Sequence, residues 1–213
     1  MDVAIIDYGV GNLRSVQKAF AARGHEAVIT SDADAIRRAP RVLLPGVGAF
    51  GAAVDTLRAA GLEGVTLDAA RSGRPFLGIC VGMQLLFSQS EEMGTHRGLG
   101  LFPGSVLRFD ERNMGAGARG VKVPQIGWNA LEFDGTRAPC PLFAGLPSGT
   151  EVYFVHSYFC RPDSGANVTA ARTDFIAPYT SAVWDGGSVY GTQFHPEKSG
   201  DAGLRILDNF ARL

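Results

Sequence analysis

The chain has 213 residues, 46% of them hydrophobic, which suffices for one folded domain with a substantial core. Its 20 Lys and Arg residues balance 21 Asp and Glu residues, so we expect neither nucleic acid nor an anionic membrane surface as a partner. No apolar run reaches the roughly 18 residues that a membrane-spanning helix needs. The N-terminus lacks the basic and apolar regions of a secretory signal, so we expect a cytoplasmic location.

The first part of the chain alternates short apolar runs with stretches of helical periodicity. The predicted strands are Val3–Asp7, Ala27–Thr30, Arg41–Leu44 and Pro75–Ile79. The predicted helices are Leu13–Ala22, Ala52–Ala60 and Leu62–Arg71. Such alternation favours a parallel sheet with helices on its faces.

Beyond residue 100 the pattern changes to strands that are separated by Pro and Gly turns. These strands are Ser105–Phe109, Val152–Phe159, Asn167–Ala171, Ala182–Asp185 and Ser188–Gln193, and a final helix is predicted at Ala202–Leu213. The Gly-rich segment 113–120 is predicted to be an exposed loop. Because there is neither a repeat nor an interdomain linker, we expect residues 1–213 to form a single domain.

A nucleophile motif follows the strand at Pro75–Ile79. Gly78–Gly82 reads GICVG and precedes the helical run MQLLF, which is the pattern of a nucleophile elbow. A tight strand-to-helix turn would place Cys80 at a helix N-terminus, where the thiolate is favoured over the thiol. The backbone N–H of Val81 would then face the oxyanion of a tetrahedral intermediate. The other cysteines, Cys140 and Cys160, lack such a context and are expected to be small buried side chains.

A nucleophilic cysteine needs a base, and the segment GTQFHPEKS offers one. His195 and Glu197 follow a predicted strand at a spacing that allows both side chains to point to one side. The carboxylate would orient the imidazole, which then exchanges protons with the thiol and the leaving amine. Alone, this segment is also compatible with a surface turn. We expect His25 to cap a helix end and His96 to lie in a loop. There is no HExxH motif, so we expect no metal site.

The segment PGVGAFG, at 45–51, has the form of a second donor loop for the oxyanion. Gly46, Gly48 and Gly51 allow bare backbone to approach a ligand. On its own the segment is equally compatible with an ordinary strand-to-helix turn. No dinucleotide fingerprint or Walker A lysine accompanies it.

Together, PGVGAFG, GICVGMQLLF, PQIGWN, YFVHSYF and GTQFHPEKS resemble the class I, triad-type glutamine amidotransferases. With YGVGNLRS at the N-terminus, the resemblance is to those members that supply ammonia for imidazole glycerol phosphate formation in histidine biosynthesis. The motifs span residues 6 to 199. The resemblance implies a three-layer α/β domain with a mostly parallel central sheet, and a glutaminase that needs no cofactor.

The resemblance also implies roles for individual residues. Cys80 is the expected nucleophile, His195 the general base and acid, and Glu197 its orienting partner. The expected oxyanion donors are the N–H groups of Val47 or Gly48 and of Val81. The expected glutamine-binding residues are Gly46, Gln84, Glu92 and the backbone of His156, Ser157 and Tyr158.

The expected partner is a cyclase subunit of (β/α)₈ fold, which forms a heterodimer with this chain and receives its ammonia. Two positions depart from the family pattern: Val81 stands where Leu is frequent, and Gln125 stands where His is frequent. The second departure argues against a titrating group at position 125. Three alternatives stay open: a glutaminase that serves a different synthase, a stand-alone cysteine hydrolase of γ-glutamyl substrates, and a non-catalytic regulatory protein on the same fold.

Overall fold

A computed structural model describes residues 1–110, 122–133, 135 and 138–213 of the chain. Five parallel strands form its centre, in the order β2 (Ala27–Thr30), β1 (Val3–Ile6), β3 (Val42–Leu44), β4 (Phe76–Ile79) and β13 (Val189–Thr192). Every residue of β1, β3, β4 and β13 is buried, which accounts for the largely apolar sequences of these strands. The parallel sheet expected from the alternating pattern is confirmed.

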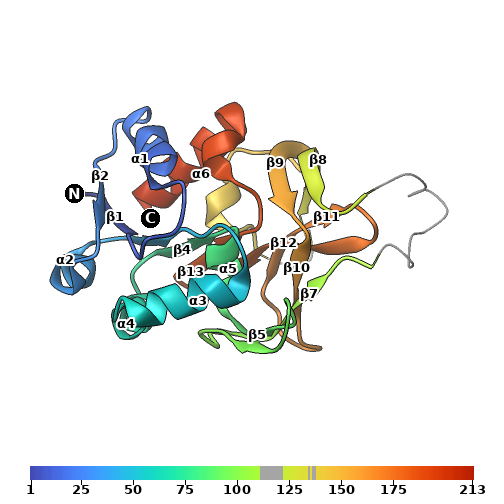
Figure 1. Cartoon of the computed structure of the whole chain (residues 1–213). Coiled ribbons are helices and arrows are strands. Elements are labelled where there is room, and N and C mark those ends of the chain that lie inside the picture. Colours follow the sequence, from blue (N-terminus) through green and yellow to red (C-terminus); the bar gives the residue numbers. More distant parts are fainter. Residues whose placement is uncertain (111–121, 134, 136–137) are drawn as a thin grey trace.

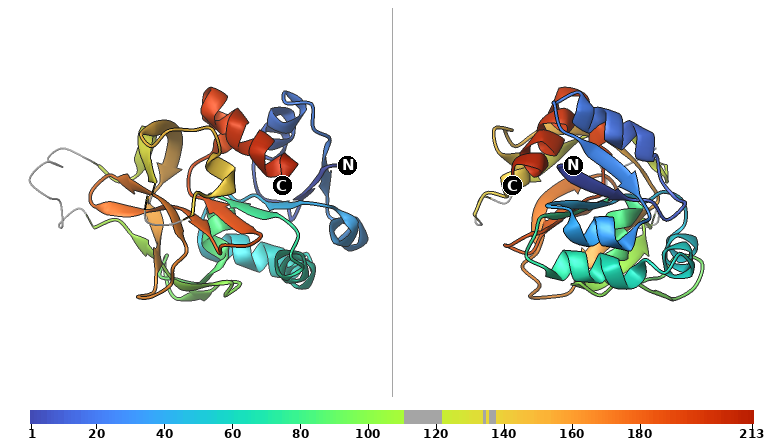
Figure 2. Two further views of the ribbon diagram at one scale, coloured as in Figure 1. Left: turned by 180° about the vertical axis from the view of Figure 1, so that it is seen from behind. Right: turned by 90° about the vertical axis from the view of Figure 1, so that its left-hand side faces the viewer.

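Helices cover both faces of these central strands, which gives three layers (Figures 1 and 2). One face carries α1 (Leu13–Ala21) and α6 (Gly200–Arg212), and the other carries α2 (Ala33–Arg38), α3 (Phe50–Ala59) and α4 (Glu63–Arg71). The helix α2 is short and was not predicted from the sequence. Asp32 caps its N-terminus, because the Asp32 side chain accepts a hydrogen bond from the N–H of Asp34. No helix of the described residues is long and apolar enough to cross a membrane.

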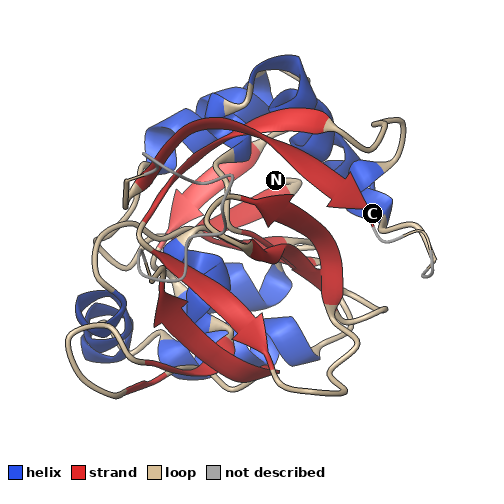
Figure 3. Ribbon diagram, turned by 90° about the vertical axis from the view of Figure 1, so that its right-hand side faces the viewer, coloured by secondary structure: helices blue, strands red, loops and turns tan. Residues whose placement is uncertain are grey.

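The chain beyond α5 extends the sheet with mainly antiparallel strands, seen among the curved ribbons of Figure 3. They continue outward from β13 through β12 (Pro178–Trp184), β10 (Tyr158–Pro162), β7 (Phe102–Arg108), β5 (Phe87–Ser90) and β6 (His96–Arg97). A branch adds β11 (Thr169–Asp174), β8 (Gln125–Phe133) and β9 (Thr150–His156). His96 therefore lies in a strand, and its prediction as a loop residue was wrong.

The predicted strand Val152–Phe159 is two strands with different neighbours. β9 pairs with β8, whereas β10 pairs with β7 and β12, and Ser157 lies between the two. The break falls at the polar residues His156 and Ser157, but two polar residues in an otherwise apolar run are also compatible with one continuous strand. The break has a consequence for function, because Ser157 lines the cavity described below.

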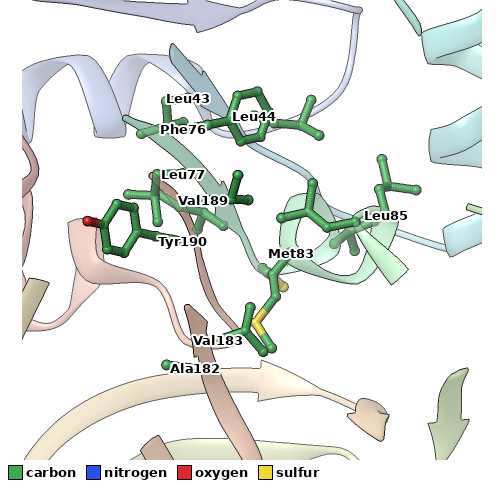
Figure 4. Packing of buried hydrophobic residues seen from close by; sticks show 14 of the residues in the cluster. Leu43, Leu44, Phe76, Leu77, Met83, Leu85, Ala182, Val183, Val189 and Tyr190 are labelled. Carbon is green, nitrogen blue, oxygen red and sulfur yellow. The ribbon is translucent and has the colours of Figure 1, made fainter. Parts of the chain in front are cut away.

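Close packing holds the turn after β4 against its neighbours. Met83, in the short helix α5 (Val81–Leu85), packs beside Val183 of β12 (Figure 4). A Cβ atom on Gly191 would lie 2.7 Å from Met83 and 2.8 Å from Val183, so only glycine fits at that position of β13. This core fixes the position of α5 relative to the sheet. The predicted segment 113–120 lies outside the described residues.

Candidate active site

Cys80 occupies a strained turn between β4 and α5. Its φ of 55° and ψ of −114° lie outside the regions that non-glycine residues usually adopt. Adjacent glycines make the turn sterically feasible: a Cβ on Gly78 would lie 2.7 Å from the carbonyl oxygen of Gly82, and one on Gly82 would collide with the carbonyl oxygen of Leu44. The geometry matches the predicted nucleophile elbow. The predicted helical run is shorter than expected, since α5 ends at Leu85 and β5 begins at Phe87.

His195 lies beside Cys80 and is held in place from behind. Its Nδ1 is 2.8 Å from Oε1 of Glu197, and both side chains are almost fully buried. The backbone N–H of His195 donates to the carbonyl of Tyr153, and the hydroxyl of Ser199 donates to the carbonyl of His195. Burial acts to lower the pKa of His195, but interactions with Cys80 and Glu197 outweigh it and raise the pKa to about 9. The site therefore favours a charged imidazolium next to the sulfur.

The PGVG segment forms a loop between β3 and α3. The hydroxyl of Tyr8 donates to the carbonyl of Pro45 at 2.8 Å, which anchors the start of the loop. The N–H of Phe50 donates to the Glu92 carboxylate at 2.6 Å, which anchors its end. Gly48 has a φ of +85° and no atom near a Cβ position, so the peptide between these anchors has room to turn.

A cavity of about 280 Å³ joins these parts. It is lined by predicted site residues, namely Val47, Gly48, Cys80, Val81, Gln84, Glu92, His156, Ser157, Tyr158 and His195, together with Val155 and Lys198. Two predicted residues lie behind this lining. Glu197 backs His195, and a Cβ on Gly46 would lie 2.5 Å from the backbone nitrogen of Gly82, so Gly46 packs against the elbow.

A chain of buried hydrogen bonds runs behind the cavity wall. Nε2 of Gln84 donates to the carbonyl of Tyr158 and to Oε1 of Gln193, both at 3.1 Å. Nε2 of Gln193 lies 3.8 Å from Sγ of Cys80, within the range for a hydrogen bond to sulfur. Gln84, at α5, therefore connects the Ser157 break to the nucleophile through Gln193.

The same carbonyl of Tyr158 also receives a contact from His156, whose Nδ1 lies 2.7 Å away. Burial, offset in part by this hydrogen bond, lowers the pKa of His156 to about 4. The His156 Nε2 is 3.2 Å from the hydroxyl of Tyr179, which donates to Oε1 of Gln125 at 2.8 Å. Gln125 is thus a buried, neutral partner of Tyr179.

Three residues at or behind the cavity were not predicted from the sequence, namely Gln193, Lys198 and Val155. Gln193 stands two residues before His195, and this spacing in extended backbone was a usable signal. Lys198 follows Glu197 directly, but its approach to the cavity depends on the short 3₁₀ turn Pro196–Lys198, which the sequence does not indicate. Val155 reaches the cavity because β9 ends there.

Other parts of the described chain lack comparable chemistry. A second cavity, of about 270 Å³, has Cys140 in its described lining but no histidine or carboxylate. No group of three His, Cys, Asp or Glu side chains in the described ranges is placed to hold a metal ion. Cys140 and Cys160 are buried and form no disulfide within the described residues, as predicted.

Comparison with known proteins agrees with this geometry. The family model for class-I glutamine amidotransferases matches residues 4–213. The imidazole glycerol phosphate synthase subunit HisH of Syntrophotalea carbinolica is 50% identical over 211 residues, which cover 99% of this chain and 100% of that protein. The HisH subunit of Thermococcus kodakarensis is 47% identical, with 99% of this chain and 100% of that protein covered.

Solved structures show the same fold at lower sequence identity. A crystal structure of a glutamine amidotransferase covers 100% of both chains with a TM-score of 0.73 and 20% identity. A chain in the structure of PurLQS from Thermotoga maritima matches 99% of this chain and 97% of its own length, with a TM-score of 0.70 and 17% identity. From the family match and the near-complete alignment with HisH subunits, the chain belongs to the class-I glutamine amidotransferases.

Proposed function

We propose that this chain hydrolyses glutamine to glutamate and ammonia with Cys80, His195 and Glu197, and that it supplies the ammonia to the cyclase subunit of imidazole glycerol phosphate synthase. The observation that carries the proposal is the strained turn of Cys80 beside a His195 that Glu197 holds at 2.8 Å, at the wall of one cavity. The HisH names of the relatives supply the identity of the synthase.

The reaction begins when the Cys80 thiolate attacks the carboxamide carbon of glutamine, which creates a tetrahedral oxyanion. His195 gives its proton to the departing nitrogen, the C–N bond breaks, and ammonia leaves behind a γ-glutamyl thioester. His195 then accepts a proton from water as the water attacks the thioester. Cleavage of the C–S bond releases glutamate and restores the thiolate. Glu197 keeps Nδ1 of His195 occupied, so Nε2 carries the transferred protons.

The PGVG loop and the elbow supply the groups that stabilise the oxyanion in this scheme. Val81, the first residue of α5, offers one N–H, and the peptide of Val47 or Gly48 offers the other. Both segments line the cavity. The open surroundings of Gly48 support a loop that turns its N–H toward the oxyanion only when the partner is loaded, since this would limit wasteful hydrolysis.

Glutamine fits the polar groups on the cavity wall. Both N–H groups of the Gln84 amide are used by Tyr158 and Gln193, so the group that Gln84 can offer to a substrate ammonium is its carbonyl oxygen. Glu92 lies in the same lining and carries the complementary charge. In this proposal the backbone at Ser157 and Tyr158, which also line the cavity, binds the substrate carboxylate.

The proposed partner surface lies beside this cavity, to which Tyr153 and Lys198 connect it. Ile126 and Trp128 of β8 are 63% and 55% exposed, which is unusual for such large apolar side chains. The ring of Trp128 packs edge-on against the ring of Tyr153. Lys198, which lines the cavity, has its Nζ over the Tyr153 ring, 6.0 Å from the ring centroid. A (β/α)₈ cyclase that forms a heterodimer through this surface would receive ammonia directly.

The deciding experiment measures glutamate release by the wild-type chain and by Cys80→Ala, each with and without the cyclase in the presence of the cyclase substrate. We expect hydrolysis by the wild-type chain only, and a large increase with the loaded cyclase. Cys140→Ser serves as the matched control and should stay active, because Cys140 lies outside the catalytic cavity. Hydrolysis by Cys80→Ala at the wild-type rate would refute the covalent mechanism.

A further inference from the structure

We propose that Gln193 stabilises the thiolate of Cys80 through an N–H···S hydrogen bond, a role that rests on the proposed function of Cys80 as nucleophile. Gln193 is fully buried and does not line the cavity, so it cannot bind glutamine itself. Its amide nitrogen nevertheless lies 3.8 Å from the reactive sulfur. It therefore reaches the sulfur from inside the protein, as an addition to the triad.

The direction of this hydrogen bond follows from the network behind it. The carbonyl oxygen of Tyr158 can only accept, so the end of the Gln84 amide that faces it must be the NH₂ group. The same NH₂ group faces Gln193, which must therefore present its oxygen to Gln84. The remaining end of the Gln193 amide is its own NH₂ group, and this is the end that faces the sulfur.

A donor at this place favours the ionised form of the sulfur, because hydrogen bonds to a charged acceptor are stronger than those to a neutral one. The helix α5 has only 5 residues, so its dipole is a weaker source of stabilisation than the sequence suggested. The principal cation at the sulfur is the His195 imidazolium, whose pKa is raised. Gln193, which is fully buried, complements this cation with a neutral donor.

Other titratable groups near the sulfur do not replace this donor. Tyr8, Cys160 and Tyr179 interact electrostatically with Cys80, and burial raises the pKa of all three, so they stay neutral near pH 7. Glu92 and Lys198 line the same cavity with opposite charges. The neutral N–H of Gln193 is thus a stabilising contact that does not change with pH over this range.

The test measures how fast iodoacetamide alkylates Cys80 as a function of pH, with the Cys80 peptide resolved by mass spectrometry in the full chain. Gln193→Met keeps the length of the side chain and removes the N–H. We expect the midpoint of the alkylation profile to rise by about one pH unit, which corresponds to about a tenfold slower reaction below the midpoint. Gln193→Glu should raise the midpoint further, because it places an anion beside the thiolate.

Gln89→Met is the matched control, because Gln89 is exposed on β5 and remote from the elbow, and its midpoint should equal that of the wild type. Glutamine hydrolysis in the loaded complex provides a second measurement, in which Gln193→Met should lower kcat and leave KM unchanged. If Gln193→Met folds, an unchanged midpoint in that variant would overturn the proposal. If it does not fold, an unchanged midpoint in folded Gln193→Glu would do so. Because alkylation needs no glutamine, this result is independent of the Cys80→Ala assay that tests the triad.

Discussion

At the scale of single residues, the environment of His195 explains why three side chains act together. Its ring is fixed by Glu197 at one nitrogen and its backbone by the carbonyl of Tyr153. The second carboxylate oxygen of Glu197 is buried without a hydrogen-bond partner among the described residues, so the bond to His195 is its main stabilising contact. The carboxylate and the imidazole therefore depend on each other for their positions.

This dependence predicts an order of severity for two substitutions. We expect His195→Asn to be nearly as damaging to kcat as loss of the nucleophile, since triad members act as a unit. Glu197→Gln should be milder, because the imidazole can still exchange protons without its orienting partner. Rates of glutamate release by the complex measure both. Full activity of His195→Asn would leave Cys80 without a base and refute its assignment.

The lowered pKa of His156 predicts how the free energy of unfolding depends on pH. Its pKa is about 4 in the folded chain against an ordinary value of 6.5, so between these values the unfolded chain binds a proton that the folded chain does not. The contribution of His156 to the free energy of unfolding is therefore fully present above pH 6.5. It is lost as the pH falls toward 4, which lowers the free energy of unfolding by about 3 kcal/mol in total. Melting temperatures should decline from pH 7 to pH 5, and less steeply in His156→Gln. Equal slopes in the two proteins would contradict this prediction.

The catalytic residues could be predicted from the sequence because each belongs to a short motif with its own local geometry. GICVG requires a tight turn, and His-Pro-Glu places two side chains two positions apart. The spacing of Gln193 two residues before His195 can place it on the same side of the strand, but it does not indicate which groups Gln193 contacts. Its role depends on a carbonyl of Tyr158 and an amide of Gln84 that come from distant parts of the chain, and sequence spacing carries no information about such contacts.

At the scale of elements, hydrogen bonds hold the two ends of the PGVG loop, and its centre at Gly48 has open space around it. Tyr8 holds Pro45, and Glu92 holds Phe50 at the start of α3. The Glu92 carboxylate also lines the cavity, so the end of the loop and the substrate site share one charged group. Movement is thus confined to the peptides next to Gly48.

Gly48→Pro should therefore depress the stimulated glutaminase activity while sparing assembly. Proline removes an N–H and fixes φ near −65°, whereas Gly48 has a φ of +85°. Loss of one oxyanion donor lowers the rate by about 10²–10³. Glutamate release with the loaded cyclase measures the effect, and gel filtration of the complex checks assembly. Equal rates for the isolated wild-type chain and the loaded complex would rule out a loop switch and leave the triad unaffected.

The parallel strands and most helices were predictable because they are buried and periodic. The division of Val152–Phe159 was not, because the polar residues at the break are compatible with one continuous strand and only the neighbours show that there are two. β8 was missed because Ile126 and Trp128 face outward on a strand whose inward residues include polar Gln125. A pattern of this kind is typical of a surface that is covered by a partner, and it hides the strand from periodicity arguments.

At the scale of the whole molecule, the cavity and the exposed β8 surface lie next to each other. Trp128→Ala should weaken binding of the cyclase by at least about tenfold, because large aromatic side chains contribute most to such interfaces. Its effect on the melting temperature of the isolated chain should be small, since Trp128 is 55% exposed. Titration calorimetry measures the affinity, with Trp184→Phe as a control outside this surface. Unchanged affinity in Trp128→Ala would place the partner elsewhere.

The glycine contacts at the elbow also constrain how this protein can evolve. Any single substitution of Gly46, Gly78 or Gly82 adds a Cβ atom within 3 Å of neighbouring backbone, which cannot move aside as a side chain can. At Gly64, by contrast, a Cβ meets open space. We therefore expect substitutions to be tolerated at surface positions such as Gly64. Replacement of any of the three elbow glycines would require a change in the surrounding backbone as well. The PGVG loop and the Cys80 turn are therefore expected to be conserved together.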